Sequence, residues 1–296
     1  MKIDISNKLS EIERYKEKCE EWKKNHLVWN PFHKDLLFRL SWNSNSLEGN
    51  TLSLEETIQV IEYDEVRSGH TFTEYQEAKT MYAALSQKMT FKGNTKIDLQ
   101  WIKDTNYLIM QKDGEFRKED VYIGTPVEVV YYPPKYQKVP ELMKRYTEDL
   151  PIPETIQEKD VIAHVARKHI EFERIHPFKD GNGRTGRVIM HQQLLNQGIL
   201  PAIIKDQSKY RQAFRRYDKN GETSLMEYVI AEGILETYHR LENVYEKFLC
   251  RDTNEIIKCN SYVEEPKLIE EQSMKQCMER TATRMPERKL DKKLDR

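Results

Sequence analysis

The chain has 296 residues, enough for one large domain with a buried core, and its 48 basic and 49 acidic residues leave a net charge of −1. The lack of a basic excess argues against nucleic acid as a partner, and no apolar run is long enough to cross a membrane. The chain start lacks the apolar stretch of a secretory signal, and the four cysteines are far apart without a CxxC pair. We therefore expect a cytoplasmic protein with reduced thiols and no zinc site.

The spacing of apolar residues predicts a mainly helical protein. We expect an N-terminal helix within residues 1–33 and a second helix over about 34–49, which ends at Gly49 because glycine commonly follows the last helical turn. The same spacing predicts further helices over residues 162–170, 188–197, 210–217 and 225–249.

Three short patterns predict where helices begin. Ser53 with Glu56, and Thr73 with Gln76, have the residue types and spacing of a capping box. Asp98 precedes another amphipathic stretch and is expected to cap it through its side-chain oxygen.

Two segments differ from this helical background. Between about residues 115 and 140 the chain is rich in β-branched and aromatic residues and is punctuated by glycine and proline, which predicts a short β-hairpin. Residues 250–296 are densely charged and carry few large apolar side chains, so we expect a weakly packed helix or a disordered tail. The main domain is then expected to span residues 34–249.

Residues 176–187, with the sequence HPFKDGNGRTGR, combine groups that suit a polyphosphate. The glycines within 181–183 allow close backbone approach, and they stand just before a helix whose first amide groups would face a bound anion. Arg184 and Arg187 are three residues apart, so that both can project from the first helical turns toward phosphate oxygens.

Two further groups in this segment indicate phosphate-transfer chemistry. Asp180 is a lone carboxylate just before the glycines, and Mg²⁺ beside phosphates typically takes one or two such ligands. His176 titrates near neutral pH and could remove a proton from an attacking hydroxyl. Residues 181–186 also match the dinucleotide pattern G-x-G-x-x-G, but a segment of helical spacing precedes them instead of a strand, so a Rossmann site is not expected.

The segment resembles the signature of the Fic family, H-x-F-x-[D/E]-G-N-G-R-x-x-R, and every fixed position is present. The resemblance covers about residues 34–245 and implies a Fic-type helical domain in which the hairpin is a flap over the nucleotide. It further implies a protein adenylyltransferase, which moves AMP from ATP, with Mg²⁺, to a Ser, Thr or Tyr hydroxyl of a protein and releases pyrophosphate. Relatives that act as kinases have lysine at the position of Gly183, so the glycine favours AMP transfer.

The resemblance implies a role for each position of the signature. His176 is similar to the general base, Asp180 to the Mg²⁺ ligand, Arg184 to the arginine that steadies the phosphates and Arg187 to the arginine that binds the γ-phosphate. The other residues expected around the nucleotide are Val121, Tyr122, Ile123, Gly124, Gly181, Asn182, Gly183, Thr185, Gly186, Tyr210 and Asp218.

An upstream segment, Ser44 to Gly49, is similar to the family's inhibitory pattern [S/T]-x-x-x-E-[G/N]. Glu48 would place a carboxylate at the C-terminal end of a helix, where the dipole disfavours it by about 0.3–1 kcal/mol, so a cationic partner is expected. The resemblance implies that this partner is Arg187 and that the pair keeps the γ-phosphate of ATP from binding productively.

The sequence leaves other functions open. In some relatives the inhibitory glutamate positions a water that removes AMP, so the chain could be a bifunctional enzyme or a de-adenylylase. A nucleotide-responsive binding or regulatory module is a third alternative, although the intact His176 argues against it because a pure binder needs no base. We expect a protein substrate that docks on the flap, and self-modification; a homodimer is compatible with the sequence.

Overall fold

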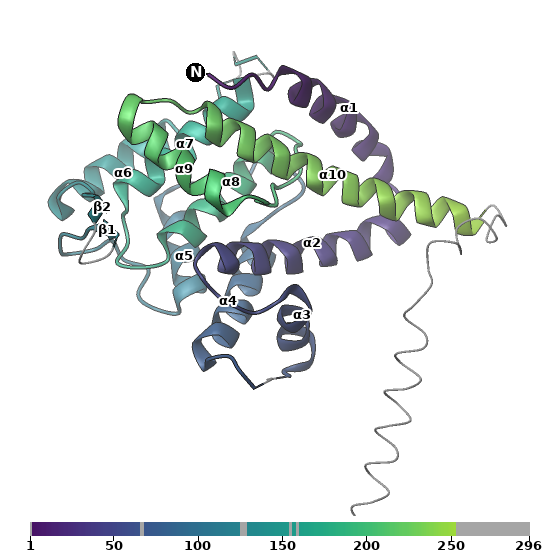
Figure 1. Cartoon of the computed structure of the whole chain (residues 1–296), viewed down its shortest axis with the longest axis horizontal. Helices are drawn as coiled ribbons and strands as arrows, with labels where there is room; N and C mark the ends of the chain where they lie inside the picture. The colour runs from purple at the N-terminus through teal and green to yellow at the C-terminus, as the bar shows by residue number, and fades with distance from the viewer. Residues whose placement is uncertain (1, 66–67, 125–128, 154–155, 158–159, 253–296) are drawn as a thin grey trace, which may run out of the picture. The chain divides into compact units, whose positions relative to one another are not determined.

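The computed structural model describes residues 2–65, 68–124, 129–153, 156–157 and 160–252, with side chains as far as Leu249. This part of the chain forms ten α-helices, one short 3-10 helix and one two-stranded sheet (Figure 1), which confirms the predicted mainly helical class. The helices are α1 (Ser6–Trp22), α2 (His26–Leu47), α3 (Leu54–Tyr63), α4 (Phe72–Lys88), α5 (Leu99–Met110), η1 (Tyr136–Lys138), α6 (Val139–Glu148), α7 (Val161–Ile175), α8 (Asn182–Asn196), α9 (Gln207–Asn220) and α10 (Ser224–Asp252).

The chain divides into one unit of residues 1–244 and a second of residues 245–296, of which only the end of α10 is described. The N-terminal helix α1 belongs to the first unit, where Tyr15 donates a hydrogen bond to Glu242 of α10 at 2.7 Å. Most of the predicted tail, from residue 253 on, lies outside the described residues. None of the described helices combines the length and apolar composition needed to span a bilayer.

The helix starts follow local capping chemistry. The predicted capping box of Ser53 with Glu56 is present at α3, and Asp98 accepts from Trp101 N at 2.9 Å at the start of α5. The prediction for α4 was wrong by two residues, because Thr71 is the cap and Glu74 its partner. Glu74 is a carboxylate and therefore a stronger acceptor for the cap amide than the amide side chain of Gln76 would be.

The helix that ends in the inhibitory pattern is longer than its predicted range of 34–49. It begins at His26, because Asn25 accepts a hydrogen bond from Leu27 N at 3.1 Å and caps it. Pro31 lies inside α2 and hides this start in the sequence, since proline interrupts the helical pattern. The helix ends at Leu47 with Gly49 at a φ of +99°, as the glycine predicts.

The core that positions the central motif lies between α5, α6, α7 and α8. Helices α7 and α8 pack against each other, and α5 also packs against α8 (Figure 1). Their apolar faces form one buried cluster of Ile102, Val139, Met143, Tyr146, Phe172, Ile175, Phe178 and Ile189, among others. Since Phe178 belongs to this cluster, the loop between α7 and α8 is anchored from within.

The predicted hairpin is small. Strand β1 (Ile123–Gly124) pairs antiparallel with β2 (Val129–Tyr131), with Ile123 opposite Tyr131. Val127, one of the residues on which the hairpin prediction rested, lies outside the described residues. Both strands are short and part-exposed, in contrast to the buried helices behind them.

Candidate active site

The motif loop, residues 176–181, joins α7 to α8 and is fixed by its own side chains. His176 ends α7 in the left-handed region with a φ of +49°, which turns the chain out of the helix. Asn182 accepts from Phe178 N and donates to Phe178 O, both at 2.9 Å. The Asn182 side chain therefore closes the loop, and any contribution of this residue to anion binding would come from its backbone amide.

The start of α8 has the geometry of an anion site. Gly181 stands before the helix at a φ of +76°, and the first backbone hydrogen bond runs from Thr185 N to Gly181 O at 2.9 Å. The amides of residues 182–184 precede this bond, so they point out of the helix end together with the positive end of its dipole. Asn106 supports the loop from α5 by donating to Asp180 O at 3.0 Å.

A cavity of about 430 Å³ opens at this helix end. It is lined by the motif loop, the end of α2, the flap and α9: Leu47, Glu48, Ile123, Val130, Glu173, Arg174, His176, Lys179, Asp180, Gly181, Asn182, Gly183, Arg187, Tyr210, Arg211, Phe214 and Arg215. A larger cavity of about 630 Å³ lies near the start of α5 and the end of α8. None of the motif residues predicted for catalysis lines it. The chemistry therefore points to the smaller cavity.

His176 is set up to accept a proton. Its Nδ1 lies 3.3 Å from Glu173 O, and because a carbonyl can only accept, Nδ1 carries the proton and Nε2 has the free lone pair. Burial lowers the pKa of His176 to about 4, with the Glu173 carbonyl opposing and Arg117 reinforcing the shift. The imidazole is then neutral at pH 7, which is the form that a general base requires.

Asp180 fits a Mg²⁺ ion that is shared with phosphates. Its side chain is 58% exposed and lines the cavity, and Oδ1 accepts from Gly181 N at 2.6 Å, which orients the carboxylate. Among the described residues no group of three or more His, Cys, Asp or Glu side chains could hold a metal by itself. A single protein carboxylate plus phosphate oxygens is the arrangement that Mg²⁺ commonly accepts.

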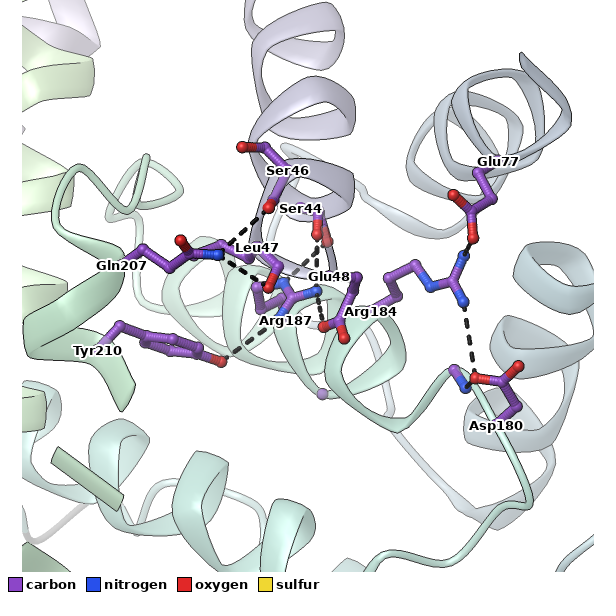
Figure 2. Close-up of polar contacts among 12 residues, drawn as sticks. Ser44, Ser46, Leu47, Glu48, Glu77, Asp180, Arg184, Arg187, Gln207 and Tyr210 are labelled. Carbon is purple, nitrogen blue, oxygen red and sulfur yellow. Dashed lines mark hydrogen bonds and ion pairs between the residues drawn. The ribbon is translucent and has the colours of Figure 1, made fainter. Parts of the chain in front are cut away.

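Arg187 and Glu48 meet in space, although 139 residues separate them. Figure 2 shows the Arg187 guanidinium against the end of α2, where Nη2 donates to Glu48 Oε1 at 2.6 Å and to Ser44 O at 2.9 Å. Its Nε donates to Ser44 Oγ at 2.8 Å. The cation thus satisfies a helix-terminal carbonyl and removes the electrostatic penalty of a carboxylate at that end.

The pair is electrostatically strong and sterically specific. Loss of hydration raises the pKa of Glu48, but the charge and hydrogen bond of Arg187, together with the charges of Arg184 and Arg211, outweigh it and lower that pKa. Arg187 is 2% exposed, and in spite of that burial Glu48 raises the pKa of its guanidinium further. A Cβ on Gly183 would overlap the Glu48 carboxylate, so any other residue at this position would push Glu48 out of its present position.

Tyr210 and Glu173 complete the surroundings of Arg187. The Tyr210 hydroxyl accepts from Arg187 Nη1 at 3.4 Å and lies 2.7 Å from Nε2 of buried His169. Glu173 is buried, its Oε1 has no hydrogen-bond partner among the described residues, and burial raises its pKa to about 7 against the opposing charge of Arg187. Glu173 is thus a third carboxyl group in the lining of the cavity, after Glu48 and Asp180.

Several residues predicted around the nucleotide do not line this cavity. Arg184 and Thr185 face α4 and α5, where Arg184 pairs with Glu77 and Thr185 accepts from Asn106. Asp218 forms a two-pronged pair with Arg174 at 2.6 and 2.7 Å. The other residues predicted around the nucleotide that lie outside the lining are Val121, Tyr122, Gly124 and Gly186, and Ser44 and Gly49 of the predicted inhibitory pattern also lie outside it.

Sequence reasoning missed three charged residues that shape the site. Arg117 donates to His176 O at 2.9 Å, to Glu119 O at 2.9 Å and to Pro134 O, so it joins the motif loop to both arms of the flap. Arg174 stacks on Tyr131 of β2 with its Cζ 4.6 Å from the ring centre. Glu77 holds Arg184. Each stands in an ordinary-looking charged stretch, and no sequence pattern marks it.

Comparison with known proteins agrees with this geometry. Residues 96–194 match the family model described as Fic/DOC family. The protein adenylyltransferase Fic of Drosophila willistoni is 31% identical over 186 residues, which are 60% of this chain and 36% of that protein. The corresponding protein of Culex quinquefasciatus is 29% identical over the same length. The chain spans about a third of the length of these relatives.

Solved structures show the same fold at lower sequence identity. Fic-1 of C. elegans (residues 134–508) superimposes with a TM-score of 0.68 at 21% identity, covering 81% of this chain and 72% of that one. A Fic-domain-containing signaling protein of Bacteroides thetaiotaomicron gives 0.66 at 18% identity, covering 81% and 97%. The signature over residues 176–187 lies within the segment that matches the Fic/DOC family, residues 96–194, and the chain shares the fold of the solved Fic-domain structures.

Proposed function

We propose that this chain is a protein adenylyltransferase that moves AMP from ATP to the hydroxyl of a Ser, Thr or Tyr side chain. The observation that carries the proposal is the composition of one cavity. It holds a neutral histidine, a helix N-terminus, the exposed Asp180 carboxylate and Arg187 together. The similar proteins of Drosophila willistoni and Culex quinquefasciatus are named protein adenylyltransferases, which supports the proposal.

The geometry suggests how the residues divide the reaction. Nε2 of His176 accepts the hydroxyl proton as that oxygen attacks the α-phosphorus. A phosphorus–oxygen bond forms, the bond from the α-phosphorus to the bridging oxygen breaks, and pyrophosphate leaves with the electron pair. The amides at the start of α8 stabilise the charge on the phosphates. Mg²⁺ held by Asp180 would neutralise phosphate charge when bound.

We further propose that Glu48 inhibits this reaction. Each nitrogen of the Arg187 guanidinium has a partner in the described structure: Nε donates to Ser44, Nη2 to Glu48 and Nη1 to Tyr210. A γ-phosphate would have to displace Glu48 before it could use the same guanidinium. ATP could then enter the cavity without reaching the geometry for transfer, so activation would require that α2 release Arg187.

The flap is the proposed docking site for the target. Ile123 and Val130 line the cavity from the two strands, and β1 and β2 pair only with each other among the described residues. An extended target segment could add to an edge of this sheet and bring its hydroxyl toward His176. Self-modification would follow if a flexible part of a second copy served as the segment.

Labelled ATP tests the proposal. Incubation with ATP labelled at the α-phosphate should label protein, whereas the same incubation with γ-labelled ATP should not. EDTA should stop the labelling, because the transfer needs Mg²⁺. Label from γ-labelled ATP would indicate a kinase and overturn the proposal, and labelling that EDTA does not affect would exclude the role of Asp180.

One observation favours removal of AMP as a second candidate. The Glu48 side chain is 40% exposed and lines the cavity, so it could orient a water as well as hold Arg187. An adenylylated target incubated with the chain should then release AMP, and Glu48→Gln should abolish the release. AMP release that persists in Glu48→Gln would remove this candidate.

A further inference from the structure

Arg184 and Arg187 belong to the same signature but have different surroundings. The Arg184 side chain is 6% exposed and turns toward α4 and α5 (Figure 2). Its Nη1 donates to Glu77 Oε1 at 2.9 Å, and its Nη2 lies 3.4 Å from Met110 Sδ. The same Nη2 forms a long ion pair with Asp180 Oδ1 at 3.7 Å, without a hydrogen bond (Figure 2).

The Glu77 carboxylate is held at both oxygens. While Oε1 accepts from Arg184, Oε2 accepts from Asn50 Nδ2 at 3.0 Å. Asn50 also donates to Glu74 O at 3.1 Å, so it is fixed to α4. Glu77 therefore has a defined orientation, and it connects the turn after α2 to the start of α8.

Two carboxylates lie within 4 Å of the Arg184 guanidinium, and they interact with it unequally. Glu77 takes the short hydrogen bond, and Asp180 stays at a longer distance with a side chain that is 58% exposed. A guanidinium and a Mg²⁺ ion compete for the same carboxylate oxygens, because each is stabilised by the same negative charge. The partner of Arg184 thus decides how available Asp180 is to a cation.

We propose that Glu77 is a positioning residue that keeps the ion pair of Arg184 with Asp180 long and so leaves the Asp180 carboxylate available to Mg²⁺ and ATP. The inference rests on the proposed nucleotide site. Without the charge of Glu77, Asp180 is the remaining carboxylate within ion-pair distance of the buried guanidinium, and the long pair closes into a hydrogen-bonded one. Mg²⁺ must then break that pair before it can bind.

Binding of ATP at increasing Mg²⁺ concentration, measured by isothermal titration calorimetry on the full chain, tests the inference without a catalytic readout. Glu77→Gln keeps the size of the side chain and removes its charge. It should raise the half-saturating Mg²⁺ concentration about tenfold, the effect expected for a charge-assisted hydrogen bond. Glu74→Gln is the matched control on the same helix, since Glu74 contacts Thr51 and Thr71 but not Arg184. It should leave the Mg²⁺ requirement unchanged.

A second variant separates this role from simple destabilisation. Arg184→Gln added to Glu77→Gln removes the competing guanidinium and should return the half-saturating Mg²⁺ concentration toward the wild-type value. If Glu77→Gln instead tightens ATP binding without Mg²⁺ and leaves the Mg²⁺ requirement unchanged, Glu77 only withholds Arg184 from phosphates and the inference is wrong. Mg²⁺-dependent binding that follows the predicted order, without any AMP transfer, would support the inference and reject the proposed function. Absence of ATP binding in the wild-type chain would overturn both.

Discussion

The motif loop and the flap face the same cavity but are built differently. The loop is closed by Asn182, anchored by buried Phe178 and supported by Asn106 from behind. The flap has strands of two and three residues, and its Val130 is 44% exposed although it lines the cavity. The loop is therefore preorganised by packing, whereas the strands of the flap pair only with each other among the described residues.

The difference indicates how the two regions share the proposed reaction. Groups that act on ATP need fixed positions, and the loop provides them. Groups that accept a target of variable sequence are better supplied by a backbone edge, because strand pairing does not depend on side-chain identity. Arg117 donates hydrogen bonds to both regions and therefore links the flap to the loop.

The largest loss of AMP transfer is expected from a substitution in the motif loop. His176→Ala should lower AMP transfer by roughly 10²–10⁴-fold and leave ATP binding nearly intact, because the base is lost and the phosphate site remains. Labelling from α-labelled ATP and calorimetric ATP binding measure the two effects. The control His239→Ala changes an exposed histidine on α10 and should keep full activity. Retention of most of the transfer by His176→Ala would remove the general-base role.

A substitution in the flap should lower transfer to a protein target more than it lowers ATP binding. Ile123→Pro removes a backbone N–H from β1 and should lower transfer to a protein target by about tenfold, with a smaller change in ATP binding. Ile123→Ala keeps the N–H and is the matched control, so it should retain more of the transfer. If both variants lose transfer and ATP binding equally, the flap serves the nucleotide site and the contrast between the two regions disappears.

The smallest effect concerns stability behind the loop. Burial raises the pKa of Glu173 to about 7 from an ordinary value of 4.5. A carboxyl group with a raised folded-state pKa contributes stability below the unfolded value, and this contribution is lost as the pH rises from about 4.5 to 7. Glu173→Gln cannot ionise, so its unfolding free energy should gain on the order of 1–3 kcal/mol over wild type above pH 7 and little near pH 4. Denaturant unfolding that shows an equal difference at both ends would contradict the assignment.

Sequence reasoning located the motif loop well because its chemistry is local. The positions of His176, Asp180 and the glycines of 181–183 follow from one contiguous pattern, and the structure brings them to one cavity. The place of Glu48 at a helix C-terminus predicts a cationic partner, and the resemblance to the family's inhibitory pattern implied that this partner is Arg187.

Other features could not be read from the sequence because they depend on packing between distant elements. Asp218 was expected near the nucleotide, and in the structure it pairs with Arg174 through two hydrogen bonds. No sequence pattern near either residue indicates such a pair. Arg184 follows the signature yet turns to Glu77 on α4. The start of α2 was also missed, because the cap at Asn25 precedes a proline that suggests a break.

The central claim is that Glu48 restrains Arg187 in an adenylyltransferase, and self-labelling from α-labelled ATP tests it most directly. Glu48→Gly frees Arg187 for the γ-phosphate and should raise labelling about tenfold or more, since a charge-assisted pair is lost. Glu48→Gln retains the side-chain size without the charge and should give an intermediate rise. Arg187→Ala in the Glu48→Gly background should cancel the gain, because coupled residues are not additive. Labelling of Glu48→Gly at the wild-type level under saturating ATP and Mg²⁺ would contradict the account.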